Sequence, residues 1–282
     1  MKILLFGSSG FLGTKLYNFF LNNHDVIGTC QKNTGGKLVF LDANNLEEIE
    51  KLIVSIMPDI TINAMGITNS FECEKNPEIA EKINVYASKK ISDVSKKIGA
   101  KQVFISSSYV FDGEKGDYIE EDLPNPQTKY GQMKLKVEKS VLSNDGIVLR
   151  VEVMYGYNGK DKPNGVVGKV IKNEILEERN PDQERSPLSV DDVGPAILSI
   201  VSKNYSGLFH LAGPDKMSMH FLLTSLKEAT GSSVEIVKFN DPNALVKTPQ
   251  NATLSSKKIN TLGIKTTSFK KGISILNKQI SK

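Results

Sequence analysis

The sequence predicts an α/β fold, in which a doubly wound parallel sheet is followed by a smaller α/β region. Two observations lead to this prediction. Short apolar runs of strand length alternate with segments of helical periodicity up to residue 150. The first apolar run, residues 2–6, ends in a glycine-rich turn that precedes a helical segment, which is typical of a Rossmann-type fold. Strands joined through helices imply right-handed crossovers and therefore parallel strands.

The elements of the first half follow from apolar runs and their spacing. Strands are expected at residues 2–6, 26–28, 38–41, 59–64, 103–106 and 147–150. Helices are expected at residues 11–20, 46–57, 77–98 and 127–143.

The pattern changes after about residue 155, where a loop is expected because turn-forming residues crowd together. These residues are Gly156, Gly159, Pro163, Asn164 and Gly165. Beyond the loop we expect helices at 166–178, 191–203 and 217–230, strands at 207–211 and 234–237, and one or two short helices in the last 30 residues. We divide the chain into a Rossmann domain, residues 1–155, and a smaller substrate-binding region, residues 156–282, parts of which the Rossmann sheet could recruit.

Composition narrows the function classes. Hydrophobic residues make up 39% of the 282 residues and charged residues 24%, as in ordinary soluble domains. The net charge of +4 is too small to argue for nucleic acid, and no apolar stretch approaches the roughly 20 residues that span a bilayer. Cys30 and Cys73 are the only cysteines, so no disulfide framework is implied. We expect a cytoplasmic protein with no nucleic-acid and no membrane partner.

The turn after the first strand reads Gly7-Ser8-Ser9-Gly10-Phe11-Leu12-Gly13. Gly7 allows a tight turn, Gly10 lets the backbone approach a pyrophosphate, and Gly13 lets helix and strand pack closely. The free N–H groups at the start of the helix would then face the phosphates. A glycine turn without a ligand is the alternative, but the strand–turn–helix context favours a dinucleotide. The expected contacts are Gly7, Ser9, Gly10, Phe11 and Leu12.

The stretch Thr29–Asn33, after the second strand, has no carboxylate that could bond the ribose 2′-hydroxyl of NAD. Lys32 could face a 2′-phosphate instead, or could be a solvated loop lysine. We therefore favour NADP(H) as cofactor, with NAD(H) as the alternative. Asp42 could meet the adenine amino group, or could cap the helix that begins near Asn45. Gln31 and Ala43 are also expected among the cofactor contacts.

Tyr130 and Lys134 are four residues apart, so a helix places them on the same face. An ammonium near a phenol is expected to lower the pKa of the phenol. The phenol could then give a proton to a carbonyl oxygen, or take one from an alcohol, near neutral pH. The lysine could also bond the nicotinamide ribose. A coincidental pair on a solvated helix is the alternative, but the hydroxyls of Ser106-Ser107-Ser108 at the end of a strand favour a site.

Taken together, these features resemble the extended short-chain dehydrogenases/reductases, and more narrowly the dTDP-4-dehydrorhamnose reductase (RmlD-like) family. The segment 106–113, Ser-Ser-Ser-Tyr-Val-Phe-Asp-Gly, is similar to the Ser-Thr-Asp-Tyr-Val-Phe-Asp-Gly of the family. Further similar segments are 63–66, Cys73-Glu74 with Pro77, Ala80 and Asn84, 150–156, Asp182-Gln183 with Pro187, 191–193, 209–213 and 249–254. The resemblance covers nearly the whole chain.

The resemblance implies NAD(P)H-dependent reduction of a nucleotide-linked 4-keto sugar, as in dTDP-rhamnose biosynthesis. Ser107 takes the place of the catalytic threonine of the family, Tyr130 is the acid, and Lys134 is its partner. The implied cofactor contacts also include Ala64, Met65, Gly66, Ser106, Tyr130 and Lys134. The implied substrate contacts are Thr68, Ser108, Tyr109, Val153 and Arg185.

Two residues depart from the family pattern. Ser108 stands where the family has Asp, and Val153 stands where it has Trp. These departures put the rhamnose-specific contacts in doubt, so another nucleotide sugar could be the substrate. Arg185 could meet the diphosphate as a bidentate partner, or could be a surface arginine.

Two other functions remain open at this point. One is a nucleotide-sugar epimerase or dehydratase, although segments 109–113 and 249–254 favour the reductase branch. The other is a non-catalytic regulatory subunit, because the beta subunit of methionine adenosyltransferase resembles this family too. His24, His210 and His220 are scattered without ligand spacing, so no metal is expected, and His210 is interpreted as a packed strand residue. A homodimer is a candidate assembly.

Overall fold

The computed structural model describes residues 1–32, 37–158, 165–172, 174, 176–178, 180–238 and 246–281. Asn33 and residues 159–164 of the expected loop lie outside these ranges.

Within the described ranges, seven strands form the central sheet, in the order β11-β6-β5-β4-β1-β2-β3. The strands are β1 Lys2–Phe6, β2 Asp25–Cys30, β3 Val39–Phe40, β4 Ile60–Asn63, β5 Lys101–Ser107, β6 Ile147–Val151 and β11 Gly207–Leu211. Each neighbouring pair is parallel. The strand order reverses between β1 and β4, and ligands of such sheets bind in the crevice at this point.

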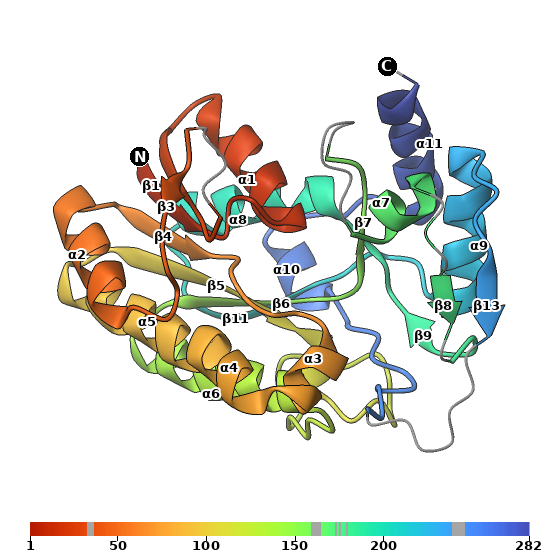
Figure 1. Ribbon diagram of the computed structural model, residues 1–282, viewed down its shortest axis with the longest axis horizontal. Helices are drawn as coiled ribbons and strands as arrows, with labels where there is room; N and C mark the ends of the chain where they lie inside the picture. Colours follow the sequence, from red (N-terminus) through yellow and green to blue (C-terminus); the bar gives the residue numbers. More distant parts are fainter. Residues whose placement is uncertain are drawn as a thin grey trace.

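Helices cover both faces of the sheet, which confirms the doubly wound α/β prediction (Figure 1). One face carries α1 Phe11–Leu21 and α8 Val193–Ser202. The other carries α2 Leu46–Ile56, α5 Ser88–Lys97 and α6 Lys129–Ser143.

Successive side chains of β1 point to opposite faces of the sheet, so the strand contributes to two apolar cores, one on each face. Ile3 and Leu5 belong to the apolar cluster that includes Leu16 of α1 and Ile197 of α8. Leu4 and Phe6, which point to the opposite face, pack in the cluster that includes residues of α2 and α5. A strand buried on both faces reads as an unbroken apolar run, which is why the sequence reveals it so clearly.

The segment expected as one helix at residues 77–98 is helical, but it is not uniform. It consists of α4 Pro77–Glu81, a π-helical segment (η1) Lys82–Ala87, and α5. A short helix, α3 Ser70–Lys75, precedes it. The π-helical segment was not foreseen; such segments occur often at functional sites.

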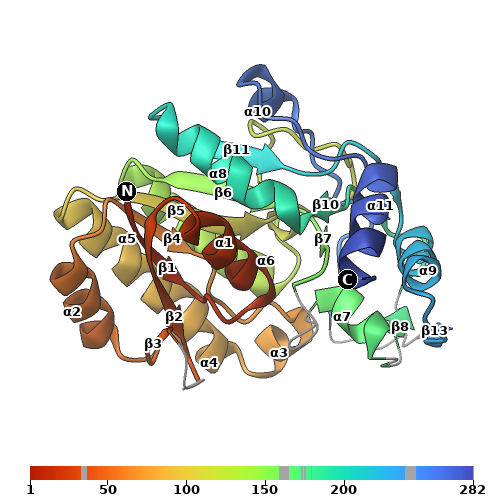
Figure 2. The same ribbon diagram turned by 90° about the horizontal axis from the view of Figure 1, so that it is seen from above.

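The smaller region lies at one end of the sheet and has its own apolar core (Figure 2). Its elements are β7 Met154–Tyr155, α7 Gly165–Ile171, β8 Leu176–Glu178, β9 Glu184–Arg185, β10 Leu188–Ser189, a 3₁₀ turn (η3) Val190–Asp192, β12 Met217–Ser218, α9 Met219–Thr230, β13 Ile236–Lys238 and α11 Phe269–Ile280. The short helix α10 Lys257–Thr261 packs instead against β11 of the central sheet. The helix expected at 166–178 was wrong beyond Ile171, because the backbone of β8 pairs in parallel with β13 instead.

One edge strand of the central sheet, β11, comes from the part of the chain after residue 156. β11 pairs in parallel with β6, and α8 lies against α1. The division into residues 1–155 and 156–282 stays a prediction, with this recruitment as its main exception. Among the described residues, no helix is long and apolar enough to cross a membrane.

Candidate active site

The candidate site is built from the turns that follow the parallel strands. β1, β4, β5 and β6 are neighbours, so their carboxyl ends lie at one edge of the sheet. The glycine turn follows β1, residues 64–68 follow β4, and a 3₁₀ turn (η2) Ser108–Val110 follows β5. The topology thus brings together segments that are far apart in the sequence.

The glycine turn has the geometry that a phosphate requires. Gly7 has a φ of +83°, which L side chains rarely adopt. A Cβ on Gly13 would lie only 2.0 Å from the Gly7 carbonyl oxygen, so the start of α1 packs directly on the turn. Gly10 is the N-cap of α1 and has no side chain that could accept from the first N–H groups of the helix. These groups can therefore receive an anion, so the turn fits the pyrophosphate of a dinucleotide.

The residues expected near the adenosine are partly exposed. Gln31 and Lys32 are exposed at the end of β2. Asp42 accepts a 2.9 Å hydrogen bond from the backbone N–H of Asn44. Asn45, and not Asp42, caps α2, because its Oδ1 accepts from Glu48 N at 3.2 Å. The alternative that Asp42 caps this helix is therefore wrong.

The turn after β4 is held by Asn84, a buried residue of the π-helical segment. Asn84 Oδ1 accepts from Ile67 N at 2.8 Å, and Asn84 Nδ2 donates to the Ile67 carbonyl at 2.9 Å. The turn contains Ala64, Met65 and Gly66, the expected cofactor contacts. Sequence reasoning missed this role of Asn84; the only signal was its place in a segment that resembles the family.

Several contacts fix the start of α6, which carries Tyr130. Thr128 is the N-cap and accepts from Gly131 N at 3.1 Å. Glu74 of α3 accepts from Lys129 N at 2.7 Å. A Cβ on Gly131 would lie 2.0 Å from the Tyr109 carbonyl oxygen, so the helix packs closely against the turn after β5. The Tyr130 side chain is thereby set beside the end of β5.

The structure brings Ser107, Tyr130 and Lys134 together, and all three are buried. Ser107 lies close enough to Tyr130 to lower the pKa of its phenol. Lys134 Nζ donates to the Ile105 carbonyl at 2.8 Å and lies 5.7 Å from the centre of the Tyr130 ring. The alternative of a solvated helix face is wrong for this pair.

The expectation that Lys134 lowers the pKa of Tyr130 needs correction. Burial raises the pKa of the Tyr130 phenol, although the neighbouring Ser107 acts in the opposite direction. Burial also lowers the pKa of Lys134 to about 8. Both shifts have the same cause, since a low-dielectric surrounding disfavours each charged form. Tyr130 is therefore a neutral phenol that can donate a proton.

The residues expected to meet substrate form a second polar group at the ends of β5 and β6. Ser108 Oγ donates to Glu152 Oε1 at 2.7 Å, and Glu152 Oε2 accepts from Val153 N at 2.9 Å. Glu152 is buried, which raises the pKa of its carboxyl, while Arg185 acts in the opposite direction. Sequence reasoning missed Glu152, because an isolated acidic residue at a strand end carries no motif.

Arg185 is not a surface residue, so that alternative is wrong. Its side chain is buried, and Nη2 donates to Gln183 Oε1 at 2.9 Å and to the Pro249 carbonyl at 3.0 Å. The guanidinium lies 5.9 Å from the centre of the Tyr109 ring. Among the other expected contacts, Thr68 is exposed, and Val153 packs against the core of the smaller region.

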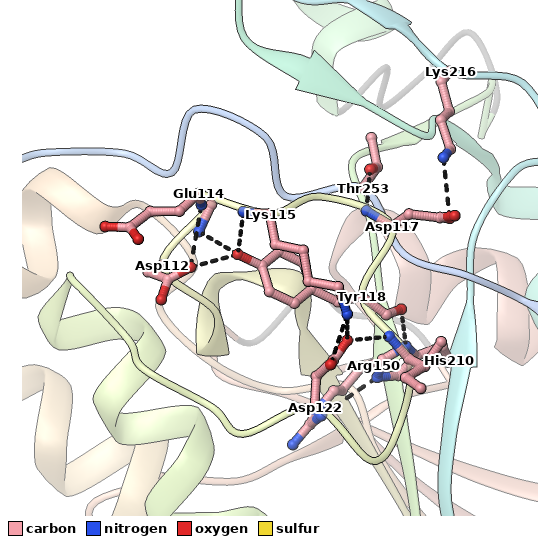
Figure 3. Close-up of polar contacts among 12 residues, drawn as sticks. Asp112, Glu114, Lys115, Asp117, Tyr118, Asp122, Arg150, His210, Lys216 and Thr253 are labelled. Atoms are coloured by element: carbon pink, nitrogen blue, oxygen red, sulfur yellow. Dashed lines mark hydrogen bonds and ion pairs between the residues drawn. The ribbon is translucent and has the colours of Figure 1, made fainter.

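Ser106 belongs to a buried network behind this edge. Its hydroxyl donates to Glu138, whose carboxylate pairs with Arg150 Nη2 at 2.7 Å. Arg150 Nη1 lies 3.3 Å from His210 Nε2, and His210 Nδ1 lies 3.0 Å from the Tyr118 carbonyl oxygen. Figure 3 shows Arg150 and His210 side by side.

The protonation of His210 follows from these partners. A carbonyl oxygen only accepts, so Nδ1 carries the proton, and Nε2 accepts from Arg150. Burial, with the Arg150 charge, lowers the pKa of His210 to about 3. His210 is a packed strand residue, as interpreted from the sequence. Among the described residues, no group of three His, Cys, Asp or Glu side chains could hold a metal ion.

Known proteins share the fold of this chain. Residues 1–281 match the family model of the RmlD substrate binding domain. The chain is 30% identical to methionine adenosyltransferase 2 subunit beta of Mus musculus, over 96% of this chain and 86% of that protein.

Two solved structures are also similar. A hypothetical dTDP-4-dehydrorhamnose reductase from Sulfolobus tokodaii is 30% identical, with a TM-score of 0.81, over 93% of this chain and 94% of that one. A dTDP-4-dehydrorhamnose reductase from Clostridium acetobutylicum is 26% identical, with a TM-score of 0.85, over the whole of both chains. Since the family model spans nearly every residue, this chain belongs to the RmlD substrate binding domain family, within the extended short-chain dehydrogenases/reductases.

Proposed function

We propose that the protein reduces a nucleotide-linked 4-keto sugar with NAD(P)H. The observation that carries this proposal is the buried group Ser107, Tyr130 and Lys134 at the sheet edge that also bears the glycine turn. The neutral Tyr130 phenol supports reduction, because a proton must reach the carbonyl oxygen. The similarity to dTDP-4-dehydrorhamnose reductases supports the substrate class.

The roles of the side chains follow from their contacts. A bound nicotinamide would supply the hydride for the C4 carbonyl carbon. Tyr130 holds the proton that the carbonyl oxygen receives, and the Ser107 hydroxyl donates a hydrogen bond to the oxygen as charge develops on it. Lys134 is fixed by the Ile105 carbonyl. Its ammonium would stabilise charge on the phenolate that the proton transfer leaves, and it would bond the nicotinamide ribose.

The cofactor and substrate contacts are part of the same proposal. Gly7, Ser9, Gly10, Phe11 and Leu12 would hold the pyrophosphate, and Lys32 would face a 2′-phosphate, which favours NADP(H) over NAD(H). Thr68, Ser108, Tyr109, Val153 and Arg185 would meet the nucleotide sugar. Ser108 stands where the resemblance leads one to expect Asp, and its hydroxyl donates to Glu152. Because this substrate contact differs from the family pattern, we include sugars other than that of dTDP-rhamnose biosynthesis among the candidate substrates. A homodimer and a cytoplasmic location stay predictions.

The test is oxidation of NADPH with a panel of nucleotide 4-keto sugars that differ in base and sugar. We expect at least one sugar to be reduced with one NADPH consumed per product, and Tyr130→Phe to abolish most of this turnover. An epimerase or dehydratase would instead convert the corresponding 4-hydroxy nucleotide sugars, without net consumption of NADPH. That outcome would overturn the reductase proposal and would favour an epimerase or dehydratase.

A regulatory subunit is the second candidate, and one observation favours it. The chain is 30% identical to a methionine adenosyltransferase 2 subunit beta over 96% of its length. The test is co-purification with the methionine adenosyltransferase of the same organism, at matched concentrations of the two proteins. A stable complex, together with NADPH binding but inactivity on every sugar, would favour this candidate over the reductase.

A further inference from the structure

Three successive turns of α6 present polar side chains to the end of β5. Tyr130, Lys134 and Glu138 are four residues apart, so they lie on one face of the helix. Each lies against a different residue of the strand: Tyr130 is beside Ser107, Lys134 donates to the Ile105 carbonyl, and Glu138 accepts from Ser106. The helix face that carries Tyr130 and Lys134 thus continues with a carboxylate, Glu138, to which the proposed function assigns no role.

Glu138 is held by residues of two strands of the central sheet. It is only 1% exposed, and Arg150 of β6 bonds both of its oxygens, Nε to Oε1 at 3.0 Å and Nη2 to Oε2 at 2.7 Å. Ser106 of β5 donates to Oε1 as well. A buried carboxylate with so many donors stays in one position, which a surface glutamate would not.

Lys134 needs a nearby negative charge because it is 5% exposed. Among the described residues it forms no ion pair within 4.0 Å; besides the Ile105 carbonyl, the Phe104 ring lies 4.7 Å from Nζ. Glu138 raises the pKa of Lys134 and so opposes the effect of burial.

The remaining titratable groups near Lys134 are few. Cys73 of α3 contacts the same core, and burial raises the pKa of its thiol, so it stays neutral. Tyr130 is neutral for the same reason. On the far side of Arg150, His210 of β11 is neutral as well. Glu138 raises the pKa of Lys134 more than Cys73 does, and Arg150 fixes the Glu138 carboxylate in place.

We propose that Glu138 is a positioning residue for the proposed reaction, which keeps Lys134 protonated at its place beside Tyr130. This inference rests on the proposed function, but its central claim concerns the charge of Lys134 and can be tested without turnover. Arg150 and Ser106 act through Glu138: they fix the carboxylate one helical turn behind the lysine.

The experiment follows the Nζ of Lys134 by NMR in protein labelled with ¹⁵N-lysine, over a pH titration, with the signal assigned by Lys134→Arg. Glu138→Gln should lower the titration midpoint of Lys134 by at least about one pH unit, a tenfold change in its acid dissociation constant, because an opposite charge nearby is removed. The matched control is Glu81→Gln, which removes a carboxylate that pairs with Lys136 on the outer side of α6 at 2.6 Å. It should leave the midpoint unchanged.

A second variant covers the case in which Glu138→Gln does not fold, since Arg150 would be left unpaired in the core. Glu138→Gln with Arg150→Met removes both charges, and the Lys134 midpoint should fall in this protein as well, but by less than in Glu138→Gln, because removal of the Arg150 charge acts in the opposite direction. An unchanged midpoint in either folded variant would overturn the proposal. Failure of both variants to fold would also overturn it, because the pair would then serve mainly the stability of the fold.

The pH profile of turnover separates this inference from the proposed function. If wild type reduces a 4-keto sugar, the loss of rate on the alkaline side should move to lower pH in Glu138→Gln by the same amount as the Lys134 midpoint. If wild type reduces no sugar, the proposed function fails, whereas the NMR titration still decides the role of Glu138.

Discussion

A Cβ atom on Gly13 would lie 2.0 Å from the carbonyl oxygen of Gly7, whereas a Cβ on Gly10 would lie 3.3 Å from the same oxygen. The two glycines therefore serve different purposes. Gly13 lets α1 pack against the end of β1, so a side chain there must disturb the backbone. Gly10 lies at the start of the helix, where a Cβ atom would require the Gly7 carbonyl oxygen to move by only a few tenths of an ångström.

This difference predicts distinct outcomes for two substitutions. Gly10→Val should keep the fold but lose cofactor binding, because the side chain would occupy the pyrophosphate position. Gly13→Val should destabilise the whole protein. Thermal unfolding and the NADPH dissociation constant measure the two effects. Unchanged NADPH affinity in a folded Gly10→Val protein would show that this turn does not hold the phosphates.

The exposed Lys32 at the end of β2 predicts the cofactor preference. NADPH should bind more tightly than NADH. Lys32→Ala should reduce the difference between the two dissociation constants, because an ammonium that faces the 2′-phosphate is removed. Lys51→Ala, on the exposed side of α2, is the control and should change neither affinity. NADH binding at least tenfold tighter than NADPH, about 1.4 kcal/mol, would contradict the assignment.

Tyr130→Phe keeps the ring and removes the proton donor. Turnover should fall by roughly 10²–10⁴, about 3–5 kcal/mol of barrier, while the cofactor dissociation constant stays nearly unchanged. Lys134→Ala should reduce turnover and weaken cofactor binding together. Steady-state rates and dissociation constants on one reducible sugar check both. Near-wild-type turnover of Tyr130→Phe would remove the tyrosine from the mechanism.

Ser107→Ala tests whether a neighbouring hydroxyl can replace that of Ser107. The hydroxyls of Ser106 and Ser108 already donate to Glu138 and Glu152. We therefore expect no rescue, and a loss of roughly 10²–10³ in turnover, as for the removal of one donor to a developing oxyanion. A loss below tenfold would show that one of the two serines can turn toward the substrate. The double variants with Ser106→Ala and Ser108→Ala would identify which.

His210 predicts a loss of stability in acid. Its pKa of about 3 in the folded protein lies below the ordinary value of 6.5, so the unfolded chain binds the proton first as the pH falls. Stability should therefore decrease between pH 6.5 and 3, by about 2–3 kcal/mol from pH 7 to pH 4.5. His210→Gln keeps a donor for the Tyr118 carbonyl and an acceptor for Arg150, but does not titrate. Urea unfolding of both proteins at the two pH values measures the difference, and equal acid sensitivity would contradict the prediction.

The sequence by itself determined the sheet and its doubly wound connections. Strands buried on both faces are unbroken apolar runs, as at residues 2–6 and 147–150, and helices such as α6 show the 3.6-residue period, so both are local signals. The same holds for the glycine turn and for the Tyr130–Lys134 spacing. Local patterns misled at residues 176–178, where pairing with β13 overrides the apparent helix.

Only the tertiary structure decided what each polar side chain meets. Burial, and not spacing, sets the proton on Tyr130, and α6 must first pack on Tyr109 before that burial exists. Three polar residues have partners that the fold brings from other segments of the chain. These pairs are Asn84 with Ile67, Glu138 with Arg150, and Glu152 with Ser108. Hydrogen bonds and desolvation depend on contacts between segments far apart in the chain, and a sequence pattern records only the contacts within one segment.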